Sequence, residues 1–405
     1  MACAAPDGMD VGEDVTPDDE EDTSMADPED DPTPPAPTPL VLVPGCTATA
    51  QVGGFPTWFF FTRPDKPCTG TPGTGIDRHA INELIRLIES VPPGGRIDGH
   101  IFSISVDAVG QALLSAQERG VDVLISADGA MAVSTDSVKT YLDKLDGIVY
   151  CTSSTTDSCI STATDGISHT KLFVFTHATA PDQTQSDKVV WFGSANQTYA
   201  SGMRLYNNTV TIYGDGPLYD QMRDYLDDLR LRVRAADYYD PGSGRGHVLT
   251  ASADVYISPE STTDLVVNRL DDITPDSKCR VRVMQASIRD SRIAVVDRLI
   301  AMKRGGCQVQ VVADTVEPAA LAALKGANIP VREMLIHDKS FLVYAKYGSA
   351  YQYRVYTGSH NLSGGALRKY DEIFVKLAPE TGGVHPVYDA YLTHFTDAYA
   401  KGTPL

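Results

Sequence analysis

The chain has 405 residues, 34 basic against 53 acidic side chains, a formal net charge of −19 and 42% hydrophobic residues. That length is two to three times a typical domain of about 150 residues, so we expect two domains or one large two-lobed unit. The longest apolar runs, such as residues 40–45, fall far below the roughly 18 residues that a membrane span needs. We therefore expect no transmembrane segment.

The acidic charge is concentrated at the start of the chain. Residues 1–45 hold 13 Asp and Glu and no Lys or Arg, together with many Pro, Thr and Ala. Such a segment buries too little apolar surface to offset the entropy of ordering, so we predict a disordered, acidic, Pro-rich tether over residues 1–45. The remaining residues carry 40 acidic and 34 basic side chains, a charge near −6.

Seven cysteines favour an oxidising compartment, and so a secreted or cell-envelope protein. Six of them lie beyond the tether and allow 15 pairings, among which the sequence does not choose. These candidates for disulfides are Cys46, Cys68, Cys151, Cys159, Cys279 and Cys307. No signal peptide begins at residue 1, so we expect a secretion signal to have been removed or replaced before Met1. Cys3, beside the acidic tether, is a candidate for the lipid-modified residue of a bacterial lipoprotein.

An internal repeat organises the chain. Residues 81–129 match residues 265–314, and each copy reads helix, turn, strand, helix, glycine, strand. A strand-helix-strand unit of this length indicates a right-handed crossover between parallel strands. We therefore predict an α/β fold of two pseudo-twofold-related lobes with mixed, mainly parallel sheets flanked by helices, together forming one bilobal unit. The first lobe is expected at residues 46–247 and the second at residues 248–405.

The repeat continues into two polar motifs. An H-x-K motif is followed, 25 or 22 residues after its Lys, by the Asn of a G-S-x-N motif. The residues that match across the two copies are His169 with His337, Lys171 with Lys339, Ser194 with Ser359, Asn196 with Asn361, Arg204 with Arg368 and Tyr206 with Tyr370. His and Lys two positions apart on a strand point to the same face, so docking the two halves brings two imidazoles and two ammonium groups together.

This doubled set suits phosphodiester chemistry without a metal or a cofactor. One imidazole can attack phosphorus while the other, protonated, donates its proton to the departing alkoxide. Two Lys and two Asn can stabilise the charge on the phosphoryl oxygens, a role that a metal fills elsewhere. We predict His169, Lys171, Asn196, His337, Lys339 and Asn361 as catalytic residues, and no metal site.

At these residues the chain resembles the phospholipase D superfamily, whose signature is a duplicated H-x-K-x4-D followed by G-S-x-N. The resemblance covers about residues 55–400 and implies a phosphohistidine intermediate formed without metal. One departure concerns the family's Asp, whose positions here hold Thr176 and Tyr344. The tyrosyl-DNA phosphodiesterase branch of the family also lacks that Asp, so its loss does not imply inactivity, although it weakens assignment to the phospholipases.

The resemblance also suggests roles for the two histidines. In the family a carboxylate or amide about eleven residues after the Asn often hydrogen-bonds the catalytic His of its own half; here Glu372 and Asn207 stand at that distance. A Glu beside His337 would favour imidazolium and a proton donor, whereas an amide would keep His169 neutral. We therefore predict His169 as nucleophile, His337 as general acid and Glu372 as a further catalytic residue. The candidates for substrate binding are Ser194, Ser359, Asn207 and Asn208.

The leading expectation is phospholipase D-type hydrolysis or transphosphatidylation of phospholipids, with transient contact with a membrane surface, by a monomer. A nuclease or DNA-end phosphodiesterase of the same superfamily is the second. Against it, a charge near −6 and the lack of a Lys or Arg run argue that nucleic acid is not a partner. The third is an inactive relative that only binds a phosphorylated ligand. No motif defines the head group, but loops 151–166 and 176–188 are expected to border the cleft.

Overall fold

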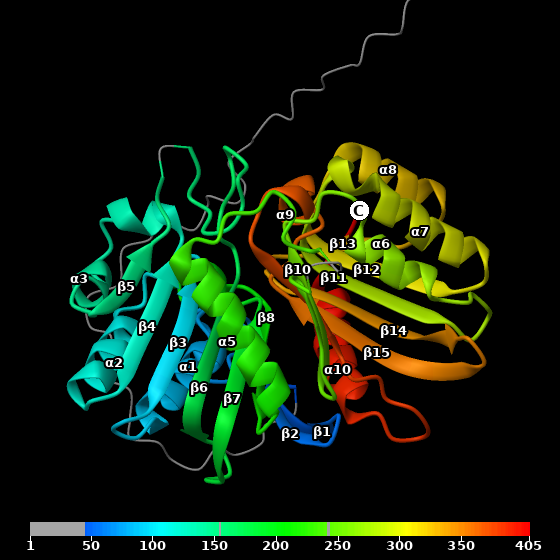
Figure 1. Ribbon diagram of the computed structural model, residues 1–405. Coiled ribbons are helices and arrows are strands. Elements are labelled where there is room, and N and C mark those ends of the chain that lie inside the picture. Colours follow the sequence, from blue (N-terminus) through cyan, green and yellow to red (C-terminus); the bar gives the residue numbers. More distant parts are fainter. Residues whose placement is uncertain (1–44, 154, 241–243) are drawn as a thin grey trace, which may run out of the picture.

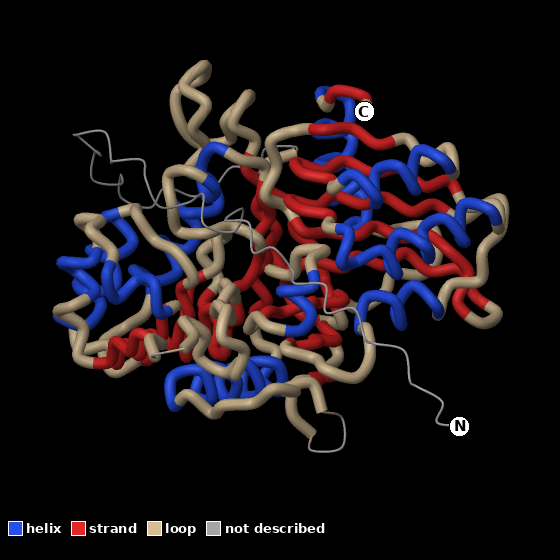
Figure 2. Tube along the Cα trace, turned by 90° about the horizontal axis from the view of Figure 1, so that it is seen from above, coloured by secondary structure: helices blue, strands red, loops and turns tan. Residues whose placement is uncertain are grey.

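The protein is described by a computed structural model, which covers residues 45–153, 155–240 and 244–405. The predicted tether up to residue 44 and Cys3 lie outside the described residues. Two sheets stand side by side, each with helices along it (Figure 1). Figure 2 shows the strands running through the middle of the molecule with helices around them. Among the described residues, no helix has the length and apolar character needed to cross a membrane.

The first sheet has eight strands in the order β1-β2-β8-β7-β6-β3-β4-β5. The strands are β1 (Thr47–Val52), β2 (Phe55–Thr62), β3 (Arg96–Ile101), β4 (Asp122–Ala127), β5 (Gly147–Tyr150), β6 (Leu172–Thr179), β7 (Gln185–Gly193) and β8 (Asn207–Tyr213). The helices of this part are α1 (His79–Ser90), α2 (Asp107–Glu118), η1 (Gly129–Val133), α3 (Lys139–Leu142), α4 (Ser201–Arg204) and α5 (Gly216–Leu231).

The second sheet repeats that order as β9-β10-β16-β15-β14-β11-β12-β13 and adds β17 beside β13. The strands are β9 (His247–Leu249), β10 (Ala253–Ser258), β11 (Arg280–Ile288), β12 (Gln308–Val316), β13 (Val331–Glu333), β14 (Lys339–Tyr347), β15 (Ala350–Gly358), β16 (Glu372–Leu377) and β17 (Thr403–Pro404). The helices are α6 (Leu265–Asp271), η2 (Asp290–Arg292), α7 (Ile293–Arg304), α8 (Pro318–Gly326), α9 (Gly364–Arg368) and α10 (Pro386–Lys401). The expected boundary between residues 247 and 248 falls inside β9, which pairs with β10.

The predicted α/β architecture with two pseudo-twofold-related lobes and mixed sheets is confirmed, but the expectation of mainly parallel sheets is wrong. In the first sheet only β3-β4 and β4-β5 are parallel pairs, and in the second only β11-β12 and β12-β13. The helical crossovers of the repeat account for these four pairs. The strands that follow in each lobe, β6-β7-β8 and β14-β15-β16, run as antiparallel neighbours. Short hairpin turns join β6 to β7 and β14 to β15, whereas 13-residue segments that contain α4 and α9 join β7 to β8 and β15 to β16.

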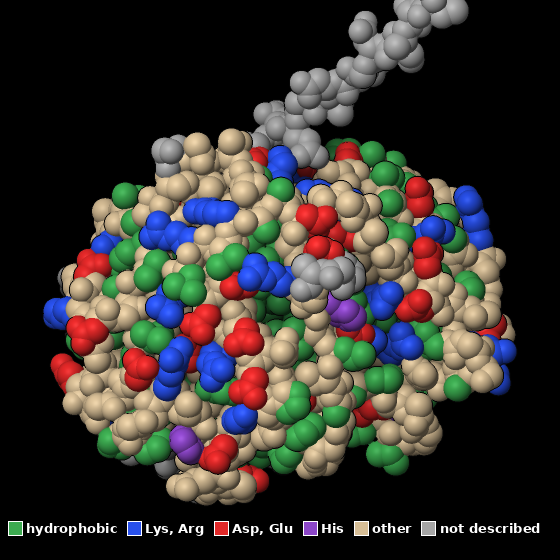
Figure 3. All heavy atoms as spheres, viewed as in Figure 1, with side chains coloured by type: hydrophobic (Ala, Val, Ile, Leu, Met, Phe, Trp, Pro, Cys, Tyr) green, Lys and Arg blue, Asp and Glu red, His purple; other side chains and the backbone are tan. Residues whose placement is uncertain are grey.

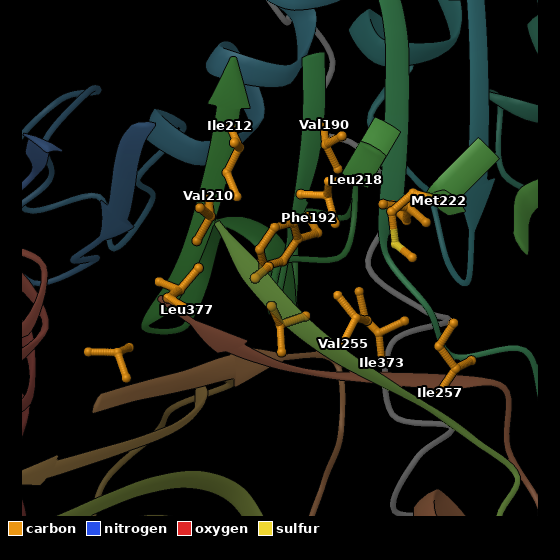
Figure 4. Packing of buried hydrophobic residues seen from close by; sticks show 14 of the residues in the cluster. Val190, Phe192, Val210, Ile212, Leu218, Met222, Val255, Ile257, Ile373 and Leu377 are labelled. Atoms are coloured by element: carbon orange, nitrogen blue, oxygen red, sulfur yellow. The ribbon is translucent and has the colours of Figure 1, made fainter. Parts of the chain in front are cut away.

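One hydrophobic core joins the two sheets. Side chains alternate along β2, so Trp58 and Phe60 pack toward α1 whereas Phe59 and Phe61 point to the space between the sheets. That shared core contains residues of both inner sheet faces, of α5 and of α10. Figure 4 shows Val190, Phe192, Val210, Ile212, Leu218 and Met222 meeting Val255, Ile257, Ile373 and Leu377. Strands buried on both faces explain the continuous apolar runs in the sequence.

Three disulfides use all six candidate cysteines, each with its nearest neighbour along the chain. The pairs are Cys46–Cys68, Cys151–Cys159 and Cys279–Cys307. Cys279 and Cys307 precede the parallel strands β11 and β12, which start level with each other. Such bridges are typical of proteins from extracellular or periplasmic compartments.

We expect the shared core to dominate stability. Leu226 and Leu231 both lie on α5, but Leu226 is 3% exposed within the shared core and Leu231 is 65% exposed. Leu226→Ala should lower the free energy of unfolding by about 2–5 kcal/mol, because it leaves a cavity. The matched change Leu231→Ala should cost less than about 0.5 kcal/mol. Urea unfolding followed by circular dichroism measures both, and equal losses would contradict the assignment of Leu226 to the core.

Candidate active site

The two H-x-K motifs meet at the boundary between the lobes. His169 precedes β6 and His337 precedes β14, and their ring centroids lie 6.5 Å apart. Each segment is held by the opposite lobe: the backbone N–H of His169 donates to the carbonyl of Asp371 at 3.0 Å, and that of His337 to the carbonyl of Tyr206 at 2.9 Å. The predicted convergence of the two histidines is therefore present, and it depends on contact between the lobes.

The partners of the two imidazoles are crossed relative to the prediction. Nδ1 of His169 lies 2.7 Å from Oε1 of Glu372, and Nδ1 of His337 lies 3.1 Å from Oδ1 of Asn207. Glu372 therefore holds the histidine of the other lobe, whereas its spacing in the sequence predicts that it holds His337 of its own lobe. The reason is that Glu372 and Asn207 begin β16 and β8, each at the lobe boundary and facing the other lobe. A contact between Glu372 and His337 therefore cannot be the reason why His337 acts as the general acid.

The two lysines are buried in matching ways. Nζ of Lys171 donates to the carbonyl of His169 at 2.7 Å, and Nζ of Lys339 to the carbonyl of His337 at 2.6 Å. Nζ of Lys171 also lies 4.7 Å from the centroid of the Phe102 ring. That ring packs edge-on against the His169 ring, with 4.6 Å between the ring centroids. Two fixed positive charges thus stand beside the imidazoles, as binding of a phosphoryl anion requires.

Burial and the lysines act together on the imidazoles. Burial lowers the pKa of His169 well below its usual 6.5, and the charges of Lys171 and Lys339 lower it further. The pKa of His337 is lowered well below 6.5 by burial and by the same two lysines. Both rings are therefore neutral near pH 7 before an anion binds. A bound phosphodiester brings negative charge, which counteracts the lysines and favours protonation of one ring.

A cavity of about 310 Å³ opens at these groups. His169, His337, Asn196 and Asn361 all line it, and the amide of Asn196 donates from Nδ2 to Oγ of Ser201 at 2.9 Å. The other lining residues are Phe102, Ala200, Ser201, Arg204, Leu205, Ala286, Ser287, Arg289, Asp314, Thr315, Leu335 and Ile336. The cavity thus joins the predicted histidines and asparagines in one space.

The two motif serines do not line this cavity, although they were predicted to bind substrate. Both are fully buried. Oγ of Ser194 accepts from the backbone N–H of Asn208 at 3.1 Å, and Oγ of Ser359 accepts from that of Ile373 at 3.0 Å. Each serine therefore ties the end of one strand to its neighbour, which makes it a positioning residue.

The two predicted asparagines, Asn207 and Asn208, are likewise used within the fold. Asn207 accepts from His337 and holds that ring. Oδ1 of Asn208 accepts from Tyr391 at 2.8 Å, and its Nδ2 donates to Asp338 at 2.7 Å. Neither residue lines the cavity. We therefore describe both as positioning residues at the contact between lobes.

Four residues that no sequence motif identifies also line the cavity, namely Phe102, Ser287, Arg289 and Asp314. All four lie at or just beyond the carboxyl ends of the repeated strands β3, β11 and β12. In α/β sheets ligands bind beyond those ends, so the repeat itself contained a usable signal. Arg204, which matches Arg368 in the repeat, also lines the cavity although it is not among the predicted site residues.

Several other positions that the sequence places near the site lie away from the cavity. Thr176 accepts from the backbone N–H of Arg96 at 2.8 Å, and Tyr344 stacks on Tyr353 with ring centroids 4.4 Å apart. These positions of the family's Asp therefore do not line the cavity. Residues 176–188 form the β6–β7 hairpin and loop 151–166 packs on the second lobe, so neither lines it. Within the described ranges, no group of three or more His, Cys, Asp or Glu is arranged to hold a metal ion.

Comparison with known proteins agrees with this fold. Residues 84–230 match a family model described as cardiolipin synthase, PLD-like domain. Phosphatidylserine synthase from Haemophilus influenzae Rd KW20 is 11% identical, with a TM-score of 0.54 over 80% of this chain and 84% of that protein. Polyphosphate kinase from Porphyromonas gingivalis is 11% identical, with a TM-score of 0.50 over 85% of this chain and 55% of that protein.

A shorter solved protein also matches. Nuc, a phospholipase D family member from Salmonella typhimurium, is 25% identical, with a TM-score of 0.30 over 38% of this chain and 97% of that protein. No curated protein sequence matches the chain. The fold and the doubled site define a phosphodiesterase-type protein. The resemblance to the phospholipase D superfamily is confirmed, with a PLD-like domain recognised over residues 84–230.

We expect both active-site imidazoles to remain neutral at pH 6 in the ligand-free protein. Titration of their Cε1 protons by NMR should give pKa values well below 6.5 for His169 and His337. Lys171→Met removes a positive charge that lowers both values, so it should raise the pKa of both rings. Titration of both wild-type rings near 6.5, or no upward shift in the variant, would contradict this electrostatic description.

Proposed function

We propose that the protein is a metal-independent phosphodiesterase that uses a phosphohistidine intermediate, with phospholipids as substrates. The observation that carries the proposal is the facing pair of buried imidazoles, each with a hydrogen-bond acceptor at Nδ1 and a lysine two residues later. With Nδ1 of each ring engaged, Nε2 is the atom that we propose acts on a phosphodiester. The two roles of general acid and nucleophile need such a pair.

In the first step, Nε2 of His169 attacks phosphorus and forms an N–P bond. The P–O bond to the departing alcohol breaks, and His337, protonated in the substrate complex, donates its Nε2 proton to that oxygen. In the second step, the now neutral His337 takes a proton from water, whose oxygen attacks phosphorus. The N–P bond breaks, His169 is restored, and the product is a phosphomonoester. A second alcohol in place of water gives a new phosphodiester, which is transphosphatidylation.

Glu372 supports His169 as the nucleophile. When Nε2 bonds to phosphorus and Nδ1 keeps its proton, the ring becomes cationic. The Glu372 carboxylate at 2.7 Å stabilises that charge as it develops. Asn207 holds the His337 ring through a neutral amide, so it orients this ring with less stabilisation of imidazolium, and His337 can release its proton more readily. The assignment is the one expected from the sequence, but the reason for it is reversed.

Phospholipids are favoured over nucleic acid by the walls around the site. Six of the sixteen residues that line the cavity are apolar, among them Phe102, Leu205 and Leu335. Of the two arginines that line it, Arg289 is paired with Glu317 at 3.1 Å and Arg204 is exposed, so they do not form a continuous basic track. On the face in Figure 3, Lys and Arg are interspersed with Asp and Glu rather than gathered into a basic track of the kind that nucleic acids require. The matching family model, described as cardiolipin synthase, points the same way.

We further propose that the protein acts outside the cytoplasm, as a secreted or cell-envelope enzyme that touches membrane surfaces transiently. The three disulfides support this location. Lipid attachment at Cys3 is one way to hold it there. Since both halves of the site lie on one chain, a monomer suffices for activity.

The substrate class is tested by assaying the purified chain in EDTA. We expect release of head groups from phosphatidylglycerol and phosphatidylethanolamine vesicles and cleavage of bis-p-nitrophenyl phosphate, with rates unchanged by the chelator. Single-stranded and duplex DNA should stay intact. Cleavage of DNA but not lipid would support the nuclease alternative, and silence on every substrate would support a protein that only binds a phosphorylated ligand. Loss of activity in EDTA would contradict metal independence.

Trapping the covalent intermediate tests which of the two histidines is the nucleophile. After a quench in neutral SDS with a lipid labelled in its acyl chain, the wild type should retain label on His169, because the N–P bond and the acyl ester both survive neutral denaturation. His169→Ala should retain none, whereas His337→Ala should still form adduct from substrates with a good leaving group such as p-nitrophenol. An adduct that survives His169→Ala but not His337→Ala would reverse the assignment.

Glu372→Gln should slow formation of the phosphoenzyme. The amide keeps an acceptor near Nδ1 of His169 but loses the charge that stabilises the cationic ring. We expect the burst rate to fall about 100-fold or more, as for removal of one electrostatic stabiliser, with little change in KM. Stopped-flow measurement with a p-nitrophenyl ester gives the rate. An unchanged burst would show that the carboxylate does not act on the first step.

A further inference from the structure

The cavity extends to one side of the pseudo-twofold axis only. Phe102 with Ala286, His169 with His337 and Asn196 with Asn361 are matched pairs that line it from both lobes. Every other second-lobe residue on its wall lacks a first-lobe counterpart there. These residues are Ser287, Arg289, Asp314, Thr315, Leu335 and Ile336. Four first-lobe residues around α4 complete this side of the wall, again without a counterpart from the other lobe, namely Ala200, Ser201, Arg204 and Leu205.

Residues that match across the repeat have different surroundings in the two lobes: one is used within the fold and its match lines the cavity. The register of the strands matches Asp128 with Asp314. Asp128 is fully buried and accepts from the backbone N–H of Ser168 at 2.6 Å, whereas Asp314 is partly exposed on the cavity wall. Arg368 likewise donates to backbone carbonyls at 2.6 Å, whereas its match Arg204 is exposed and lines the cavity.

A longer loop before His169 closes the first-lobe side of the site. His337 follows the end of β13 by four residues, but His169 follows the end of β5 by 19. The extra segment contains the Cys151–Cys159 disulfide and packs against the second lobe. It closes around the carboxylate of Asp371, which accepts from the backbone N–H groups of Cys159, Ile160 and Ser161 at 2.8–3.0 Å. The equivalent space beside the first lobe is therefore filled by protein.

We propose that the open, second-lobe side of the cavity is the leaving-group subsite, and that Asp314 and Ser287 select head groups that carry a hydroxyl or an ammonium group. This inference rests on the proposed function, with His169 as nucleophile. In-line attack by His169 directs the departing oxygen toward His337, whose neighbours on the wall are those second-lobe residues. The same space receives the alcohol that enters in a transfer reaction.

The chemistry of the wall defines what fits there. The carboxylate of Asp314 accepts hydrogen bonds and attracts a cation. Oγ of Ser287 is buried, with the residue 8% exposed, and has no hydrogen-bond partner among the described residues. A buried hydroxyl without a partner costs stability unless a ligand supplies one. The carboxylate therefore favours a small alcohol that carries a hydrogen-bond donor or a positive charge over a purely apolar one.

A matched pair of lipids tests the inference. Phosphatidylethanolamine and phosphatidylethanol with the same acyl chains differ only in the ammonium group of the leaving alcohol. We expect the wild type to prefer phosphatidylethanolamine in kcat/KM, and Asp314→Asn to lower that preference about 10- to 100-fold, as expected when a hydrogen bond to a charged group is lost. Ser287→Ala should lower it less. The control Asp297→Asn, exposed on α7 of the same lobe, should leave the preference unchanged.

The outcomes separate the two proposals. The burst amplitude with bis-p-nitrophenyl phosphate counts folded, competent sites in every variant, since its leaving group carries no donor. If wild type and Asp314→Asn show bursts but the same preference between the two lipids, the head-group inference is overturned and the phosphohistidine mechanism stands. If no protein forms a phosphoenzyme or cleaves a lipid, the proposed function itself fails.

Discussion

The site depends on the shared core between the two inner sheet faces. Neither lobe alone contains a complete imidazole environment, because His169 needs Glu372 from the second lobe and His337 needs Asn207 from the first. The backbone of each histidine segment is also held across the boundary. Apolar packing of β2, β7 and β8 against β10 and β16 therefore sets the distance between two polar groups that no local interaction could fix.

The fold and the identity of the site could largely be predicted from the sequence, because duplication doubles every signal. One H-x-K motif is weak evidence, whereas two copies at matching places of a repeat predict that they meet. The repeat also located the crossover helices. It did not indicate the dominance of antiparallel pairs, since the apolar runs of β6, β7 and β8 look alike whether their neighbours run parallel or antiparallel.

What could not be predicted is which atoms face each other across the lobe boundary. Spacing along the chain put Glu372 near a histidine but could not tell that it serves His169, because that depends on docking of the lobes. For the same reason Ser194 and Asn208 read as ligands of phosphate, although they tie strands and lobes together. The cavity is one-sided because the loop before His169 is 15 residues longer than the loop before His337. Alignment of the two repeats reveals this difference in length but not where the longer loop lies in space.

The crossed contacts have a consequence for how two different roles arose in one symmetric scaffold. In a pair of identical half-length chains, symmetry would force both imidazoles to have the same neighbour, and therefore the same basicity. Joining the halves in one chain frees the two positions to diverge independently. Glu at residue 372 and Asn at residue 207 are such a divergence, and each tunes the histidine of the lobe to which it does not belong. Covalent fusion thus converts a symmetric pair of groups into a polarised one.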